Sequence, residues 1–172
     1  RHDSLVKSLY KQYLHQGNTG QFNEFFCRDG SALISPSDLC FHRRLDMIEE
    51  QFSSAFVYTQ EGLAADLEEF LMRLSHFLGG SDIPVDSVDQ RKRNVGVKTE
   101  FQVRLLRSLN QINAFLEESA LPTLYNRIFG ILGLTPRTLV QYKLNGVGKQ
   151  PYTLPKDSSN YLRNHFADDW GY

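Results

Sequence analysis

The chain has 172 residues, of which 41% are hydrophobic and 23% are charged. This length allows one domain with a hydrophobic core, and the composition is ordinary for a globular protein. The formal net charge of -1 gives no general support for binding to nucleic acid or to a membrane surface, because both usually require a basic face. We therefore expect neither a nucleic-acid partner nor a membrane partner, so any anion site must be local.

Two cysteines, Cys27 and Cys40, are too few for a disulfide framework and do not have the spacing of a metal site. Two thiols packed as small hydrophobic groups are favoured over a bridge, which indicates a reducing compartment. The longest nearly apolar run, 128–134, is too short to span a bilayer. The expected location is the cytoplasm.

The first part of the chain predicts helices. Apolar residues recur at helical spacing from Leu5 to Leu14 and predict a helix that ends at Gly17. A brief helix over 21–26 and a loop over 28–35 follow. Ser35 and Pro36 then predict the start of another helix, which extends to Phe52.

A change of period follows this helix. Residues 54–60 form a short segment that is rich in β-branched and aromatic residues, which is typical of a strand. Residues 67–78 form an amphipathic pattern closed by Gly79 and Gly80. Because helix, strand and helix joined by short connections are typical of α/β architecture, we expect a mostly helical chain with one or two parallel strands.

The second half is again helical in pattern. Residues 81–97 are a polar connector, and Thr99 with Gln102 forms a capping-box pattern before a helix that runs to Glu118. Further helices are predicted from Pro122 to Gly133, from about Thr135, and from about Lys156 to near Asp169. Residues 145–151 form a glycine-bearing loop between the last two.

Few motifs carry chemistry on their own. Arg1 and Ser8, at the entrance of the first helix, offer a donor fork and a hydroxyl that suit a phosphate. The sequence around Gly146, Gly148 and Lys149 fails as a P-loop, because the first glycine and the final Ser/Thr of that motif are missing. The five histidines show no metal-ligand spacing. No metal site is predicted.

Taken together, these segments resemble the C-terminal part of sulfotransferases that use 3'-phosphoadenosine 5'-phosphosulfate (PAPS), especially the bacterial branch. The resemblance lies in the order and spacing of several segments, and no single motif is diagnostic. In this family the phosphate-binding arginine stands eight positions before the serine, whereas Arg1 stands seven before Ser8. The expected phosphate contact therefore rests more on Ser8 than on Arg1. The matching segments are 1–10, 41–52, 56–57, 61–66, 70–79, 93–95, 105–110 and 162–172.

The resemblance implies an α/β, P-loop-like sulfotransferase fold, of which residues 1–172 are the C-terminal part of a single domain. It implies an enzyme that transfers a sulfuryl group from PAPS to a hydroxyl or amine of a small-molecule or glycan acceptor, leaving the bisphosphate PAP. This portion would grip the 3'-phosphate and the nucleotide. The residues implied in nucleotide binding are Arg1, Ser8, Arg91, Lys92, Arg93, Asn94 and Lys149.

The loop that holds the 5'-phosphosulfate in this family, together with the general base, is not in these residues, so no catalytic residue is assigned. The implied partner is an N-terminal half of the same domain. The alternative is a non-catalytic helical interaction module, either a degenerate sulfotransferase remnant or an unrelated helical domain. The dominance of amphipathic helices in the sequence favours this alternative.

Overall fold

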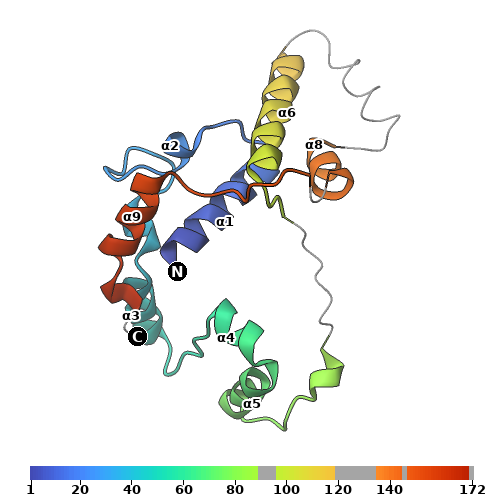
Figure 1. Cartoon of the computed structure of the whole chain (residues 1–172). Helices are drawn as coiled ribbons and strands as arrows, with labels where there is room; N and C mark the ends of the chain where they lie inside the picture. The colour runs from blue at the N-terminus through green and yellow to red at the C-terminus, as the bar shows by residue number, and fades with distance from the viewer. Residues whose placement is uncertain (89–95, 119–134, 145–146, 171–172) are drawn as a thin grey trace. The chain divides into compact units, whose positions relative to one another are not determined.

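The structure is a computed structural model that describes residues 1–88, 96–118, 135–144 and 147–170 (Figure 1). The chain divides into two compact units. Unit 1 comprises Arg1–Cys40 and Asn94–Tyr172, and unit 2 comprises Phe41–Arg93. None of the described helices combines the length and the apolar character needed to cross a bilayer.

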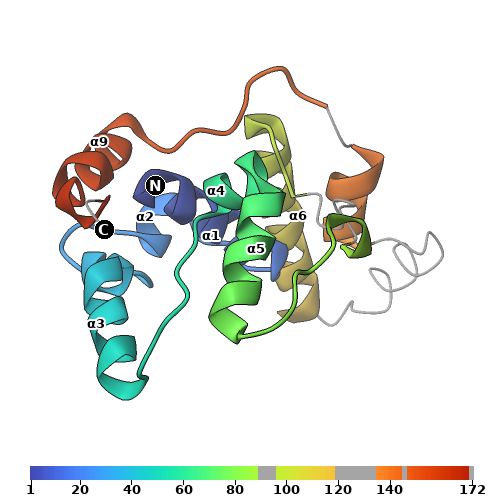
Figure 2. The same cartoon turned by 90° about the horizontal axis from the view of Figure 1, so that it is seen from below.

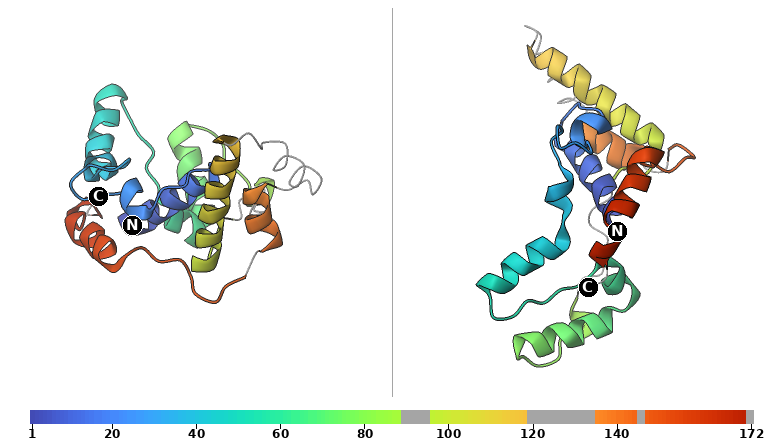
Figure 3. Two further views of the ribbon diagram at one scale, coloured as in Figure 1. Left: turned by 90° about the horizontal axis from the view of Figure 1, so that it is seen from above. Right: turned by 90° about the vertical axis from the view of Figure 1, so that its left-hand side faces the viewer.

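Unit 1 is built on three helices: α1 (His2–His15), α6 (Glu100–Glu118) and α9 (Lys156–His165). Helix α1 contacts both α6 and α9 (Figure 3). Four shorter elements and a π-helical stretch complete the described part of this unit: α2 (Phe22–Phe25), the 3-10 turns η1 (Pro36–Leu39) and η4 (Asp168–Trp170), α8 (Pro136–Thr138) and the π-helical η3 (Leu139–Lys143).

The core of unit 1 forms where α1 meets α6, α9 and the aromatic segment around α2. On α1 the buried apolar side chains are Val6, Tyr10 and Leu14, at the helical spacing of four. They pack with buried residues of the other elements, namely Phe22, Phe25, Phe26, Leu39, Val97, Val103, Leu106, Val140, Tyr152, Leu154, Leu162 and Phe166. The predicted helix over 5–14 is confirmed, and its apolar face is the one buried.

The predicted capping box at the start of α6 is also confirmed. Gln102 Oε1 accepts hydrogen bonds from the backbone N–H groups of Lys98 (2.7 Å) and Thr99 (3.1 Å). The Gln102 amide nitrogen also donates to the Leu144 carbonyl at 2.7 Å. Because Gln102 is almost fully buried with its amide satisfied, it fixes the chain before α6 against the segment after α8.

Unit 2 contains α3 (Phe41–Gln51), α4 (Gln60–Ala65), α5 (Leu67–Leu78) and the 3-10 turn η2 (Val85–Ser87), and α4 runs directly into α5 (Figure 2). Helix α5 begins and ends as its sequence predicts. Asp66 accepts a hydrogen bond from Glu69 N at 2.9 Å, and Gly79 closes the helix in the left-handed conformation with φ of 65°.

The predicted α/β, P-loop-like fold with one or two parallel strands is wrong. The described residues form helices and two isolated β-bridges, Phe26 with Ile34 and Thr99 with Pro151, but no strand or sheet. In the predicted strand over 54–60, Thr59 caps α4 by accepting from Gly62 N at 3.0 Å, and Gln60 is already helical. Local β-propensity does not make a strand without a neighbour to share its hydrogen bonds, and none lies beside 54–59 among the described residues.

Candidate functional site: a basic face on helix α1

Helix α1 has a polar face that carries no acid. At about 100° per residue, its six polar residues fall within an arc of about 140°. Asp3, the only acid of the helix, lies outside this arc. The two serines and the glutamine are exposed and the three basic residues are half-buried, so the face is partly open to solvent. The polar face of α1 consists of Ser4, Lys7, Ser8, Lys11, Gln12 and His15.

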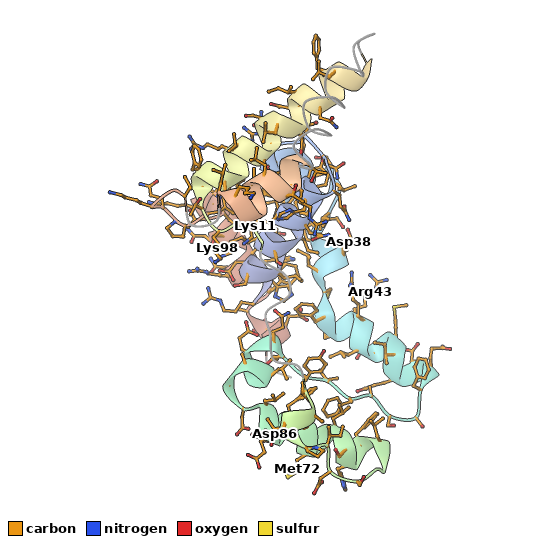
Figure 4. The ribbon with its side chains drawn as sticks, turned by 90° about the vertical axis from the view of Figure 1, so that its right-hand side faces the viewer. Lys11, Asp38, Arg43, Met72, Asp86 and Lys98 are labelled. Carbon is orange, nitrogen blue, oxygen red and sulfur yellow. The ribbon has the colours of Figure 1, made fainter. Side chains whose placement is uncertain are left out.

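The chain before α6 lies against this face, near the labelled residues Lys11 and Lys98 in Figure 4. Lys11 Nζ donates to the Val97 carbonyl at 3.0 Å, and Val97 N–H donates to His15 Nε2 at 3.4 Å. Val97 itself is fully buried. These two bonds fix Lys11, about one helical turn after Ser8, and His15, about 10 Å further along the axis than Ser8, against the chain before α6.

The electrostatics of this face favour an anion. Burial lowers the pKa of Lys11 below its ordinary value, and the neighbouring Lys7 lowers it further. Burial also lowers the pKa of His15, and the charges of Arg137 and Lys11 add to this effect. Among the described residues no carboxylate opposes either shift. A bound anion would relieve this repulsion, so the face suits a phosphate.

Ser8 lies at the centre of the face. Its side chain is exposed, one position after Lys7 and three before Lys11. An exposed serine hydroxyl can donate to a phosphate oxygen while the lysines of the same helix face supply charge. The buried Nδ1 of His15 has no hydrogen-bond partner among the described residues. The face therefore combines hydroxyl, ammonium and imidazole groups on one rigid helix.

Arg1 has a different environment. Its guanidinium forms two hydrogen bonds with the Asp3 carboxylate, from Nη2 at 2.8 Å and from Nε at 3.2 Å. Arg163 of α9 donates to the same carboxylate at 2.9 Å. Burial alone would raise the pKa of Asp3, but the bonds from Arg1 and Arg163 outweigh it and hold that pKa at about 2. Seven helical positions separate Arg1 from Ser8, about 10 Å along the axis. The structure does not bring them together.

Lys149 lies in a third place. It lines a cavity of about 400 Å³ with Glu100, Phe101 and Arg104 at the start of α6. Gly148 adopts a φ of +96°, and a Cβ added there would lie 2.8 Å from Thr99 Oγ1. In the described part of the chain, no hydrogen bond or ion pair joins Lys149 to α1. Arg91, Lys92, Arg93 and Asn94 lie outside the described residues.

Sequence reasoning found Ser8 but missed Lys7, Lys11 and His15. The available signal was their spacing of four, which places three basic groups on one helical face without an acid. The contact with Val97 joins residues far apart in the chain and has no local signal.

Comparisons with known proteins found no match: no family model, no curated protein and no solved structure is similar to this chain.

Proposed function

We propose that this chain supplies the 3'-phosphate-binding part of a PAPS-dependent sulfotransferase. The proposal rests on one observation above all: Ser8, the residue on which the family resemblance places most weight, lies at the centre of a helix face that carries Lys7, Lys11 and His15 and no acid. A nucleotide 3'-phosphate needs a hydroxyl or amide donor and positive charge at one place, and this face offers both.

In the proposed reaction an acceptor hydroxyl or amine attacks the sulfur of PAPS, the bond from sulfur to the bridging phosphate oxygen breaks, and PAP leaves. The acceptor proton passes to a general base. Such a transfer asks a protein mainly for positioning and for charge around the leaving group. Binding at the 3'-phosphate, remote from the sulfur, provides energy that orients the reacting group.

In this proposal the chain binds the 3'-phosphate and the nucleotide but does not contact the reacting sulfur. In the family the 5'-phosphosulfate loop and the base belong to the N-terminal half of the domain, which is the proposed partner. The proposed acceptor is a small molecule or a glycan. We propose the cytoplasm as the location, since its reducing conditions suit two cysteine thiols. Residues 91–94 and Lys149 remain candidate nucleotide contacts beside the polar face of α1.

Calorimetry with PAP tests the proposal. Ser8→Ala should weaken PAP binding by about fivefold and Lys11→Met by about tenfold, as expected for one neutral and one charged hydrogen bond. Ser108→Ala and Lys143→Met, which alter an exposed serine of α6 and an exposed lysine of η3, should leave the affinity unchanged. Equal affinities in Ser8→Ala and Ser108→Ala would contradict the proposal.

A second candidate function, the non-catalytic interaction module, is favoured by the surface of unit 2. In that unit the buried side chains among the described residues are Leu71 and Ser75. Large apolar side chains are exposed there, a composition typical of a surface that another protein covers: Met47, Ile48, Phe52, Val57, Tyr58, Met72, Phe77 and Leu78. PAP binding that is absent at millimolar concentration would favour this candidate.

A further inference from the structure

Unit 1 contains a second site, a cleft of about 1110 Å³ that no sequence motif indicates. It lies between α2, one face of α6 and the segment that leads into α9. Glu100, Val103, Arg104 and Arg107 line its α6 side, at spacings that place them on one helical face. A space of this size accommodates an organic ligand of moderate size.

The cleft is distinct from the polar face of α1. Its contribution from α1 is Tyr10, which is almost fully buried. Tyr10 lies about 130° around the helix axis from the middle of the polar face. The two sites are therefore on different sides of α1, and a ligand of the cleft is independent of the proposed function.

Arg107 is an arginine of the cleft whose charge has no carboxylate partner among the described residues. Its Nε is buried and has no hydrogen-bond partner among the described residues. Within the described part of the chain, no carboxylate forms an ion pair with Arg107. Tyr10 and Tyr152 lie beside it. Burial raises the pKa of both phenols, whereas a side-chain hydrogen bond with Arg107 and the Arg107 charge lower that of Tyr10, and the Arg107 charge lowers that of Tyr152. A partly buried guanidinium without a carboxylate is stabilised by an anion from outside.

Two other arginines of the cleft already have partners. Arg104 Nε donates to Glu100 Oε1 at 2.9 Å, and Arg28 lies over the ring of Tyr161 at 5.1 Å from its centroid. Within the described residues Arg107 has neither kind of contact. Arg107 contacts the Tyr10 phenol, but its charge is not balanced by a carboxylate of the described residues and its Nε is not bonded, so it is the arginine of the cleft that suits an oxyanion.

The apolar lining is aromatic. Tyr10 forms ring contacts with Phe22 and Tyr152, with centroids 5.4 Å and 6.0 Å apart, and Phe22 contacts Phe26 at 6.1 Å. All four rings line the cleft. The four rings are largely buried against one another in the core of unit 1, so they give the cleft an apolar aromatic wall on which a planar ring can pack.

We propose that this cleft binds an aromatic carboxylate, with the carboxylate on the guanidinium of Arg107 and the ring against the apolar wall that Tyr10, Phe22, Phe26 and Tyr152 form. The planar fork of arginine matches the two oxygens of a carboxylate. The aromatic side chains hold the apolar body of the ligand, and Lys156 adds positive charge at the opening.

Calorimetry with 2-naphthoate and its neutral analogue 2-naphthamide tests this site in the full chain. We expect 2-naphthoate to bind at least about tenfold more tightly than 2-naphthamide. Arg107→Met should remove this preference, and Arg107→Lys should restore it only in part. Arg73→Met, which alters an exposed arginine of α5 that does not line the cleft, should change 2-naphthoate affinity by less than about twofold.

A second variant, Thr153→Trp, keeps Arg107 and fills the cleft from its exposed lining segment. It should abolish binding of both ligands with an unchanged circular dichroism spectrum. The proposal is overturned if the folded wild-type protein binds both ligands equally or neither of them. It is also overturned if Thr153→Trp binds 2-naphthoate as the wild type does. These two results decide the matter even where Arg107→Met fails to fold.

Discussion

The side-chain amide of Asn110 on α6 donates from Nδ2 to the carbonyl oxygen of Leu14 on α1 at 2.8 Å. The same nitrogen is 2.8 Å from the carbonyl of Asn18. Leu14 lies in the last turn of α1, where its carbonyl also accepts from the Gly17 N–H at 3.1 Å, and Asn18 lies in the loop that follows the helix. Asn110 is almost fully buried, so it ties the end of the helix that carries the polar face to the core of unit 1.

Asn110→Ala should lower the free energy of unfolding by about 1–3 kcal/mol, because the hydrogen bonds from its buried amide to the Leu14 and Asn18 carbonyls would be lost. Asn164→Ala, at an exposed position of α9, should change it by less than about 0.5 kcal/mol. Urea unfolding monitored by circular dichroism measures both. An Asn110→Ala protein as stable as Asn164→Ala would show that this bond does not hold α1.

The buried histidine at the start of α1 predicts a loss of stability in mild acid. His2 Nε2 lies 2.8 Å from the Leu39 carbonyl and 2.9 Å from Asp169 Oδ2. Burial lowers the pKa of His2 below 6.5, and these two partners oppose the shift only in part. Below pH 6.5 the unfolded chain therefore binds more protons than the folded chain, so the free energy of unfolding falls as the pH falls.

The pKa of His15 is lowered in the same direction, so both histidines act together. Urea unfolding at pH 7.5 and pH 5.5 should show the lower stability at pH 5.5. The difference should be smaller in His15→Gln and unchanged in His76→Gln, which alters an exposed histidine of α5. Equal pH dependence in all three proteins would contradict this assignment.

Asp3 predicts a second, more acidic transition. Its pKa of about 2 is lower than the ordinary 3.8, so its contribution to stability is present above about pH 3.8 and is lost as the pH falls through about 2. Asp3→Asn should lower the free energy of unfolding by about 1–3 kcal/mol at pH 7 and remove this component of the acid transition. Asp157→Asn, at an exposed site, is the control.

A glycine fixes the loop that carries Lys149. Gly148→Ala should lower the free energy of unfolding by about 1–3 kcal/mol, because φ of +96° is strained for alanine and the new methyl group would meet Thr99. At Gly96 the backbone is not left-handed and no atom lies within 4 Å of an added Cβ, so Gly96→Ala should be nearly neutral. Thermal unfolding measures the melting temperatures of the two variants. Equal melting temperatures would show that alanine is not strained at position 148.

Local signals predicted the elements but not how they combine. Asp66 and Gly79 mark the ends of α5, and Thr99 with Gln102 marks the start of α6, since caps depend on neighbouring residues alone. Ser35 starts a helix as predicted, but it is the single 3-10 turn η1, and Cys40 is extended between it and α3. Residues 54–60 show why the fold class failed, because a strand depends on a partner that no local pattern reveals.

The candidate site divides in the same way. Ser8 could be predicted from the sequence, because it lies in a predicted helix and in the segment 1–10 that resembles the sulfotransferase family. The bonds from Lys11 and His15 to Val97 depend on tertiary packing that brings residues 96–98 to α1. Arg1 has the residue type that suits a phosphate, but nothing in its local pattern showed that Asp3 and Arg163 would share its charge network.

The most direct test is a nuclear magnetic resonance titration of the isotopically labelled chain with PAP and, separately, with adenosine 5'-monophosphate. The second ligand lacks the 3'-phosphate. We expect amide shifts specific to PAP that centre on Ser8 and Lys11 of α1 and on Val97, and that need about fivefold more PAP in Ser8→Ala. Identical shifts with the two nucleotides, or PAP-specific shifts confined to residues away from α1, would contradict a phosphate site on this helix.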